Sequence, residues 1–434
     1  MPIFKSSSLS PRPVYTFFSS VFLLLLLNIL VKPLWIFAID RQVQNVVGLE
    51  TYGSYFALLN ISIVFNFLLD LGITNYYNTK AAAQTHFDTH QFLETGLLKF
   101  YLGISYAIIL TAIGYFSGIA NIQLLVLLAM MQFLYSMFVF LRGQVTALQL
   151  FSTDAWLSII DKSIMILCCG VLLYRPGAFG SITILRFVWL QVIATFIAIL
   201  VAGYIVMMHG SISTIKIKLP FTILRSAWPY GAIMLVMSAI NRQDAFLLER
   251  LHPHGDYEAG VYASAYRLLD AANVAGYLVS GFLLSYISRN WKNDPQLSKV
   301  ISLCRNLLIV LATGMISVTC IFAVPLQRIL YHTENLYQVS IIQLCIPSLI
   351  GYYLVQIYGT VLTASGNIRL FLKLSIPFMV VNLSLNIFLV PKYGATACCY
   401  IAIVTQLLYG MILWRVARKK IYARVVTEAI PNFK

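Results

Sequence analysis

Charged residues are scarce in this sequence. Only 10% of the 434 residues are Asp, Glu, Lys or Arg, whereas 60% are apolar and the mean hydropathy is +0.82. A soluble domain carries about 25% charged residues, so the composition excludes an ordinary soluble protein. A bilayer offers the backbone no hydrogen-bond partners, and each spanning helix therefore needs about 20 apolar residues. The sequence predicts an all-α protein that crosses the membrane many times.

Metal ligands and reactive side chains are also few. The seven Cys form no CxxC pair and lie in or beside apolar runs, which is typical of small core residues. His86 and His90 flank Asp88 at helical spacing, a pattern more typical of a solvated loop than of metal ligands. The predicted external loops are too short for the acid, base and metal groups of most glycan polymerases or glycosyltransferases. We expect no catalytic residue, no metal site and no cofactor, apart from a coupling ion such as H⁺ or Na⁺.

Long apolar runs make up most of the chain. Twelve can span a bilayer: residues 14–39, 52–79, 96–115, 122–148, 155–174, 183–208, 227–249, 260–287, 300–324, 337–364, 368–391 and 396–417. The first is too long for a signal-peptide core and lacks a cleavage site, so we expect it to be retained. Most of the 30 Lys and Arg, Lys99 included, fall at one side of these spans. Because positive charge resists translocation, both termini are predicted to be cytoplasmic.

The net charge of +15 fits the same picture. Basic loops that face an anionic leaflet account for it, and no nucleic-acid partner is needed. The spans divide into two sets of six at a basic segment. We predict an N-terminal lobe (1–210), a cytoplasmic linker (211–225), a C-terminal lobe (226–417) and a basic tail (418–434). Six spans return the chain to its starting side, so the two lobes would be parallel repeats.

Short repeated phrases support a duplication. AIDRQ (38–42) falls at the predicted outer end of the first span, and AINRQ (239–243) falls in the outer part of the seventh. Each is followed by an acidic residue and Gly-x-Tyr, in ETYGSY (50–55) and in EAGVY (258–262). A weaker echo, RGQVTA (142–147) and YGTVLTA (358–364), ends the fourth span of each set. The shared order indicates duplicated six-helix lobes, with common helix-end residues as the alternative explanation.

Ionisable residues within the second set of spans indicate a site. Arg242 and Arg267 fall at similar depths in the seventh and eighth spans, and Asp244 and Asp270 lie close to them in sequence. A charge at the bilayer centre costs ~2.5 to 3.5 kcal/mol, so such residues face a wet cavity or a partner. Arginine suits a diphosphate because its planar fork donates two parallel hydrogen bonds. We predict that Asp244 and Asp270 hold these arginines when no ligand is bound.

The eighth span also carries a polar, aromatic face. Tyr262, Tyr266 and Asp270 recur every four residues, and we predict that they line an internal aqueous cavity. A static Arg–Asp tie between the two helices is the alternative. Substitution of Arg267 separates the two hypotheses, because a structural tie would cost expression and a ligand contact would cost transport.

Charges in the first set of spans give a weaker signal. Lys32 adjoins Pro33 and is predicted to reach the outer surface, while Asp70 lies near the inner end of the second span. Asp161 and Lys162 are neighbours in the fifth span. For each of them a local structural role and a functional role are equally compatible with the sequence.

These features together resemble a known family. The order of IDRQVQNVVGLETYGSYFALL, LLDLGITNYY, NRQDAFLLERL and EAGVYASAYRLLD, within twelve spans, is similar to that of polysaccharide (O-antigen, Wzx-type) flippases of the MOP superfamily, which includes the MATE exporters. The resemblance covers essentially the whole chain. It implies two pseudo-symmetric six-helix bundles that open a central cavity alternately to each side.

The resemblance also implies a substrate and a location. The expected substrate is an undecaprenyl-diphosphate-linked oligosaccharide, such as an O-antigen, capsule or exopolysaccharide repeat unit. The expected place is the bacterial inner membrane, beside a polysaccharide polymerase and chain-length machinery. By position, cationic cavity residues would be Arg41, Arg242 and Arg267; ion-coupling candidates would be Asp40, Asp70, Asp244 and Asp270; further polar and aromatic lining would be Gln42, Gln243, Tyr262 and Tyr266.

Two other functions stay open. A MATE-like exporter of cations or drugs shares the architecture, but its cavity should be dominated by carboxylates, whereas here buried arginines are at least as prominent. A membrane-embedded glycan polymerase or glycosyltransferase is the alternative from another class, and the short external loops count against it.

Overall fold

The computed structural model of this chain describes residues 14–74, 89–119, 121–148, 150–174, 180–209, 221–291, 296–332 and 335–429. Within these ranges the regular structure is helical and contains no strand, and the predicted all-α class is confirmed. Residues 211–220 of the predicted linker, residues 430–434 of the tail, and His86 and Asp88 lie outside the described residues. Below, "outer" means the side that the charge bias predicts to be external.

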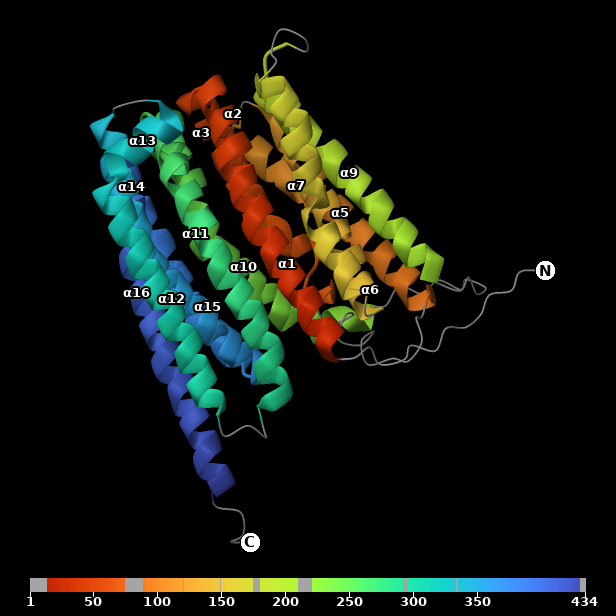
Figure 1. The fold of residues 1–434 in the computed structure, drawn as a ribbon. Helices are drawn as coiled ribbons and strands as arrows, with labels where there is room; N and C mark the ends of the chain where they lie inside the picture. The colour runs from red at the N-terminus through yellow and green to blue at the C-terminus, as the bar shows by residue number, and fades with distance from the viewer. Residues whose placement is uncertain are drawn as a thin grey trace, which may run out of the picture. The chain divides into compact units, whose positions relative to one another are not determined.

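The described helices group into two compact units (Figure 1). Unit 1 comprises Met1–Val43 and Ser62–Met234, and unit 2 comprises Gln44–Ile61 and Leu235–Lys434. The start of the second predicted span therefore groups with the C-terminal helices, which no sequence pattern indicated. The lobe boundaries given above stay predictions.

Helices of the N-terminal half are α1 (Val14–Leu34), η1 (Trp35–Asp40), α2 (Arg41–Val47), α3 (Leu49–Val64), η2 (Phe65–Leu69), α5 (Thr89–Phe116), α6 (Ile122–Ala147), α7 (Phe151–Tyr174) and α9 (Ile184–His209). Helices of the C-terminal half are α10 (Phe221–Leu251), α11 (Gly255–Asn290), α12 (Leu297–Ile321), α13 (Ala323–Tyr331), α14 (Leu336–Cys345), η3 (Ile346–Ser348), α15 (Leu349–Ala364) and α16 (Ile368–Ala429).

Ten stretches of the described chain are long and apolar enough to cross a membrane. One of them, Ile368–Tyr422, holds two predicted spans, because Gly394 at φ +55° and ψ −140° interrupts the helix. Helix α10, which matches the seventh predicted span and carries Arg242 and Asp244, is not among the ten. When Ile368–Tyr422 is counted as two spans and α10 is added, the described helices are consistent with twelve spans.

The first span differs from its prediction. A π-helical segment, η1, follows Pro33 in α1, and α2 continues to Val47 instead of ending near Ile39. The AIDRQ phrase therefore lies inside the span and not at its outer end. Lys32 lies 15 residues before Val47, roughly 22 Å along a helix, so it is farther from the end of the first span than the sequence predicted.

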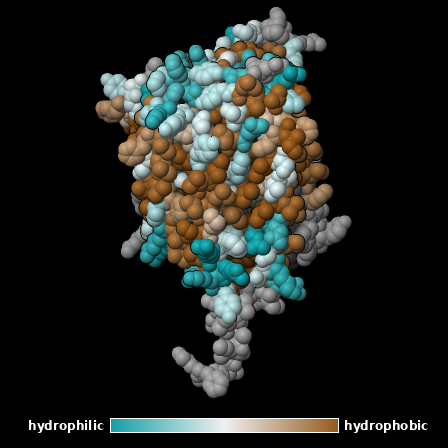
Figure 2. Space-filling model, turned by 90° about the vertical axis from the view of Figure 1, so that its left-hand side faces the viewer, coloured by the Kyte–Doolittle hydropathy of each residue, from teal (hydrophilic) through white to brown (hydrophobic). Residues whose placement is uncertain are grey.

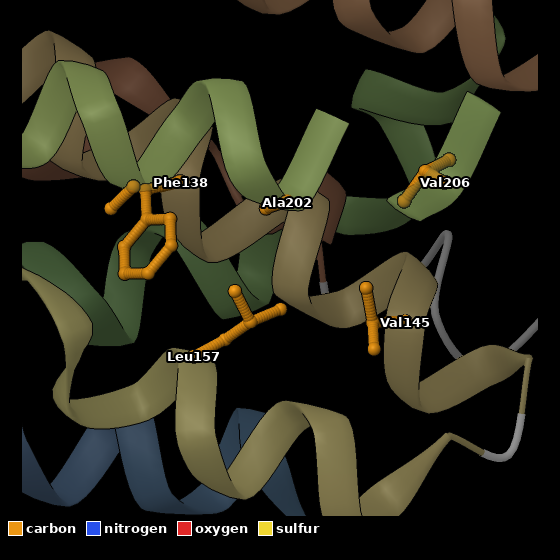
Figure 3. Packing of buried hydrophobic residues seen from close by; sticks show 6 residues of the cluster. Phe138, Val145, Leu157, Ala202 and Val206 are labelled. Atoms are coloured by element: carbon orange, nitrogen blue, oxygen red, sulfur yellow. The ribbon is translucent and has the colours of Figure 1, made fainter. Parts of the chain in front are cut away.

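Small side chains bring helices together in the core of unit 1. Phe138 and Val145 of α6 and Leu157 of α7 pack with α9 (Figure 3). On α9 the buried residues Ala198, Ala202 and Val206 recur every four positions, so one narrow stripe faces the neighbouring helices. Lipid chains are as apolar as leucine, so close van der Waals contact, and not water exclusion, holds such helices together.

In unit 2, α15 is the central helix. Leu349, Tyr353, Ile357 and Val361 are fully buried, and α15 packs with α11, α12 and α16. The Tyr353 hydroxyl donates to the Ala272 carbonyl at 2.7 Å. Helices at the periphery instead expose apolar side chains. One face of the molecule shows a broad hydrophobic surface that is bounded by hydrophilic residues at both ends (Figure 2). This pattern fits a unit whose flanks contact lipid.

The two Gly-x-Tyr phrases pack against each other where α3 crosses α11. A Cβ atom on Gly53 would lie 1.9 Å from the Asp256 carbonyl oxygen, and one on Gly260 would lie 2.1 Å from the Leu49 carbonyl oxygen. Only glycine permits this approach from both sides. The Gln44 side chain donates to the Gly260 carbonyl at 2.9 Å, so the crossing is also hydrogen-bonded.

We expect Gly260→Ala to lower the melting temperature of the purified protein by several degrees, because the added methyl group forces the α3 backbone away. Gly281→Ala is the matched control on the same helix, since no atom of the described residues lies within 4 Å of its Cβ position. Thermal unfolding in detergent measures both, and equal melting temperatures would contradict a tight crossing.

Candidate functional site

A guanidinium–carboxylate cluster lies within the spans of unit 2. Arg242 of α10 donates to Asp270 of α11 from both terminal nitrogens, at 3.1 Å to Oδ2 and 3.0 Å to Oδ1. Arg267, one turn before Asp270 on α11, places its Nη1 3.8 Å from the same carboxylate. The i,i+3 spacing puts both α11 side chains on one face, as the sequence predicted. Asp270 thus bridges two arginines from two helices.

Helix α3 supplies the other contacts of the cluster. The Tyr52 hydroxyl accepts from Arg267 Nε at 3.1 Å and Nη2 at 3.0 Å, and Asn60 Oδ1 accepts from Arg242 Nη1 at 3.5 Å. The Arg267 guanidinium also lies 5.1 Å from the Phe56 ring centroid. The tyrosine hydroxyl, the asparagine oxygen and the phenylalanine ring fix the positions of the two guanidinium groups. Sequence reasoning missed the role of Tyr52, because a tyrosine at the start of an apolar span carries no signal of its own.

The cluster is partly accessible. The side chains of Arg242, Asp270 and Arg267 are 20%, 16% and 14% exposed. By contrast, Tyr262 and Tyr266 are only 1% and 4% exposed, so neither side chain is accessible in this structure, and the aqueous cavity that they were predicted to line stays a prediction. The polar face of α11 divides into charged groups that remain accessible and tyrosines that pack against α10.

Both tyrosines make specific contacts with α10. The Tyr266 hydroxyl donates to the Asn241 carbonyl at 2.7 Å, and its ring lies 5.0 Å from the Arg242 guanidinium. The Tyr262 hydroxyl donates to Asp244 Oδ2 at 3.3 Å. Each tyrosine therefore contacts one charged residue of α10: Tyr266 packs against Arg242, and Tyr262 donates to Asp244.

Asp244 belongs to a second polar network, which contains no Lys or Arg among the described residues. It is 2% exposed, and Asn386 Nδ2 donates to its Oδ1 at 3.0 Å. Gln243 Nε2 donates to Asn382 Oδ1 at 2.6 Å, and Asn382 Nδ2 donates to the Thr405 hydroxyl at 3.2 Å. No Lys or Arg of the described residues pairs with Asp244, so the prediction that it holds an arginine is wrong. Asp270 alone does so.

The remaining predicted residues lie in unit 1. Asp40 ends η1 and is 2% exposed, and Arg41 Nη2 donates to Gln42 Oε1 at 3.3 Å. Their predicted position opposite the unit 2 arginines stays a prediction. Asp70 pairs with Lys99 Nζ at 2.5 Å where η2 ends and the chain turns through Leu71 and Gly72 at positive φ.

Lys99 was missed by sequence reasoning. It was counted among cytoplasmic residues, yet it is 1% exposed and also donates to the Thr74 hydroxyl at 3.1 Å and the Leu69 carbonyl at 3.3 Å. The ion pair of Lys99 with Asp70 lies at the end of the second span, where the regular helix stops. This arrangement is typical of a structural ion pair, because both charged groups and the Leu69 carbonyl at the end of the helix have hydrogen-bond partners.

Comparison with known proteins agrees with this geometry. A family model described as "polysaccharide biosynthesis protein" matches residues 17–291, more than half of the chain. The chain belongs to this family. A search of curated proteins finds no match.

This polysaccharide biosynthesis family member is also similar to solved transporters. They include a MATE protein in complex with MaL6 (TM-score 0.69, 12% identity), an outward-facing multidrug resistance MATE transporter of the MOP superfamily (0.67, 12%) and a MOP superfamily transporter from Pyrococcus furiosus (0.64, 13%). Each likeness covers 93% of this chain and 96% of the other. At these identities it shows the fold, and the predicted MATE-like architecture is confirmed.

In this polysaccharide biosynthesis protein, we expect Asp270→Leu to destabilise the fold by about 3 to 5 kcal/mol, because it leaves the largely buried Arg242 without its bidentate partner. The double variant Asp270→Leu/Arg242→Met should recover most of that loss. Thermal unfolding of Asp270→Leu, Arg242→Met and the double variant completes a double-mutant cycle. Strictly additive losses would show that the two side chains are not coupled.

Proposed function

We propose that this protein moves an undecaprenyl-diphosphate-linked oligosaccharide from the cytoplasmic to the outer leaflet of the bacterial inner membrane. The observation that carries the proposal is the partly accessible pair of arginines, Arg242 and Arg267, joined by Asp270 inside the spans of unit 2. Membership of the polysaccharide biosynthesis family supports a glycan-linked substrate.

The chemistry of the cluster suits a diphosphate. Two guanidinium forks can each donate paired hydrogen bonds to phosphate oxygens, and they stay charged when partly desolvated. Asp270 serves as the internal counter-ion, which a phosphate displaces on binding. The aromatic rings of Tyr52 and Phe56, next to Arg267, offer flat apolar surfaces for sugar rings. Passage needs no covalent step, because the polar headgroup only has to be kept out of hydrocarbon.

Alternating access would move the headgroup, with both termini cytoplasmic and the prenyl tail in lipid. A polymerase and chain-length machinery would use the product on the outer side. The MATE-like cation exporter remains the second candidate, because the buried carboxylate of Asp244 is a feature that favours a cation.

The Asp244 network also offers a place for a coupling ion. We propose that H⁺ or Na⁺ binds there, because the Asp244 carboxylate, the Tyr262 hydroxyl and the Asn386 amide, from α10, α11 and α16, form one network that contains no Lys or Arg among the described residues. A bound cation neutralises the carboxylate in a medium that strongly disfavours a lone charge.

Vesicles that contain the purified protein should flip a fluorescent prenyl-diphosphate disaccharide, and we expect Arg267→Gln to slow flipping at least tenfold while the melting temperature changes little. Arg186→Gln, an exposed arginine of unit 1, is the control and should flip at the wild-type rate. A wild-type protein that flips nothing under any ion gradient, yet exports a cationic dye, would favour the exporter instead.

Asp244→Asn should remove the effect of an imposed Na⁺ or pH gradient on the initial flipping rate, so that the rates with and without the gradient become equal. Glu249→Gln on the same helix, where the carboxylate pairs with Arg250 at 2.8 Å, should keep the gradient response. Full gradient stimulation in Asp244→Asn would locate ion coupling elsewhere.

A further inference from the structure

Helices α12, α15 and α16 of unit 2 carry almost no negative charge. Residues 335–427 contain no Asp or Glu, and α12 contains none either. The acidic residue of the three helices is Glu428, at the far end of α16. Asp294, which precedes α12, lies outside the described residues. The basic residues at the inner ends of these helices, opposite to the outer side, therefore have no nearby carboxylate on the helices that carry them.

Arg305 of α12 and Trp414 of α16 join two helices that lie side by side (Figure 1). The guanidinium carbon of Arg305 lies over the Trp414 ring, 5.6 Å from its centre. Nε and Nη2 of Arg305 donate to Asn306 Oδ1 at 3.0 and 2.8 Å. An aromatic face and a neutral amide thus hold the arginine in place, and neither of them cancels its charge.

A second arginine, Arg418, reaches the same place. It follows Trp414 by four residues on α16, so the two side chains lie on one face of the helix. Arg305 and Arg418 both act electrostatically on the hydroxyl of Tyr358, a residue of α15 that is 2% exposed. No carboxylate of the described residues lies within ion-pair distance of either arginine. Two guanidinium groups therefore gather around one tryptophan without a resident counter-ion in the described part of the chain.

Unit 1 handles cations at the same predicted side differently. Lys99 pairs with Asp70, and Arg142 pairs with Asp154 through two hydrogen bonds of 2.8 and 3.1 Å. Both of these cations are neutralised by the protein itself. A general excess of positive charge in the loops does not explain why the cations of one unit have carboxylate partners while Arg305 and Arg418 have none.

The surface around the two arginines is amphipathic. Toward the centre of the spans, α12 exposes Leu307 and Val310, and α16 exposes Leu408. In the opposite direction along α16, Lys419 and Lys420 are exposed. Apolar side chains therefore adjoin the arginines on the membrane side and further cations adjoin them on the aqueous side. This order matches a lipid with an anionic headgroup and not a small soluble anion, because a soluble anion has no use for the apolar surface.

We propose that Arg305, Trp414 and Arg418 form a binding site for an anionic glycerophospholipid of the cytoplasmic leaflet. The phosphate accepts hydrogen bonds from the two guanidinium groups, Trp414 lies at the headgroup level, and the acyl chains follow the apolar faces of α12 and α16. The bound lipid supplies the negative charge that the three helices lack and ties α12 to α16. This site does not rest on the proposed function.

Lipid binding to the purified, delipidated full chain in detergent tests the site, with native mass spectrometry as the readout. The probes are dioleoylphosphatidylglycerol, dioleoylphosphatidylcholine and farnesyl phosphate. We expect the wild type to bind phosphatidylglycerol at least tenfold more tightly than phosphatidylcholine, and Arg305→Gln/Arg418→Gln to bind the two equally. The two phospholipids share their acyl chains, so the difference in affinity reports the charge of the headgroup.

The matched control is Arg328→Gln/Lys392→Gln, which removes two exposed cations of unit 2 from the outer side and should keep the preference for phosphatidylglycerol. Arg418→Gln alone changes an exposed residue, and it keeps the test decisive if the double variant fails to fold. It should weaken phosphatidylglycerol binding severalfold. Without lipid, Arg418→Gln and the double variant should keep the wild-type melting temperature, because neither breaks an ion pair of the described residues.

Three results would overturn the site. The first is equal affinity of the wild type for the two phospholipids, or an unchanged preference in both arginine variants. The second is a lowered melting temperature of these variants with unchanged lipid affinity, which would show a structural role. The third is farnesyl phosphate binding more tightly than phosphatidylglycerol and being lost in the same variants, which would show that the arginines recognise a prenyl carrier. A protein that flips no glycolipid can still show the expected preference, so the site and the proposed function fail separately.

Discussion

The hydrocarbon core of a bilayer cannot solvate a charge, and this constraint organises the interior of the molecule. Each ionisable side chain in a span must find a partner in the protein or be supplied with one from outside. Lys99 and Asp70 satisfy each other completely at the broken end of the second span. Arg242, Arg267 and Asp270 satisfy each other while staying partly accessible. Asp244 has no Lys or Arg partner among the described residues, and we propose that a cation binds at that position.

Glycine contacts join the two repeated phrases. The Gly-x-Tyr phrases that follow AIDRQ and AINRQ are not only equivalent in sequence, because Gly53 and Gly260 approach each other at one helix crossing. Their flanking residues have diverged. Glu258 accepts from the Tyr337 hydroxyl at 2.6 Å and from the Ala395 backbone at 2.8 Å, whereas Glu50 is exposed. The two phrases share a backbone contact, while their acidic side chains have different surroundings.

Sequence patterns predicted the fold well because apolar length is a direct consequence of bilayer thickness. They also predicted the pairing of Arg242 with Asp270, since equal depth on consecutive helices is readable from residue counts. The sequence patterns misplaced Lys32, Asp40 and Arg41 relative to the end of the first span. After the π-helical segment that follows Pro33, the helix continues to Val47, beyond the apolar run from which its end was predicted. The patterns also misassigned Asp244: its partner Asn386, and Asn382, which accepts from the neighbouring Gln243, lie more than 130 residues away on α16. Only tertiary packing could select those partners from many polar residues in the spans.

The arginine cluster and the proposed cation site of unit 2 share one helix, and this sharing has a thermodynamic consequence. Arg242 and Asp244 are two residues apart on α10, so their side chains point about 200° apart around the helix axis. Arg242 faces Asp270 on α11, while Asp244 faces Asn386 on α16. A rigid tilt or rotation of α10 cannot move one without the other. A cation that favours one position of α10 must therefore change the affinity of the arginines for an anion, and the anion must change the cation affinity by the same factor.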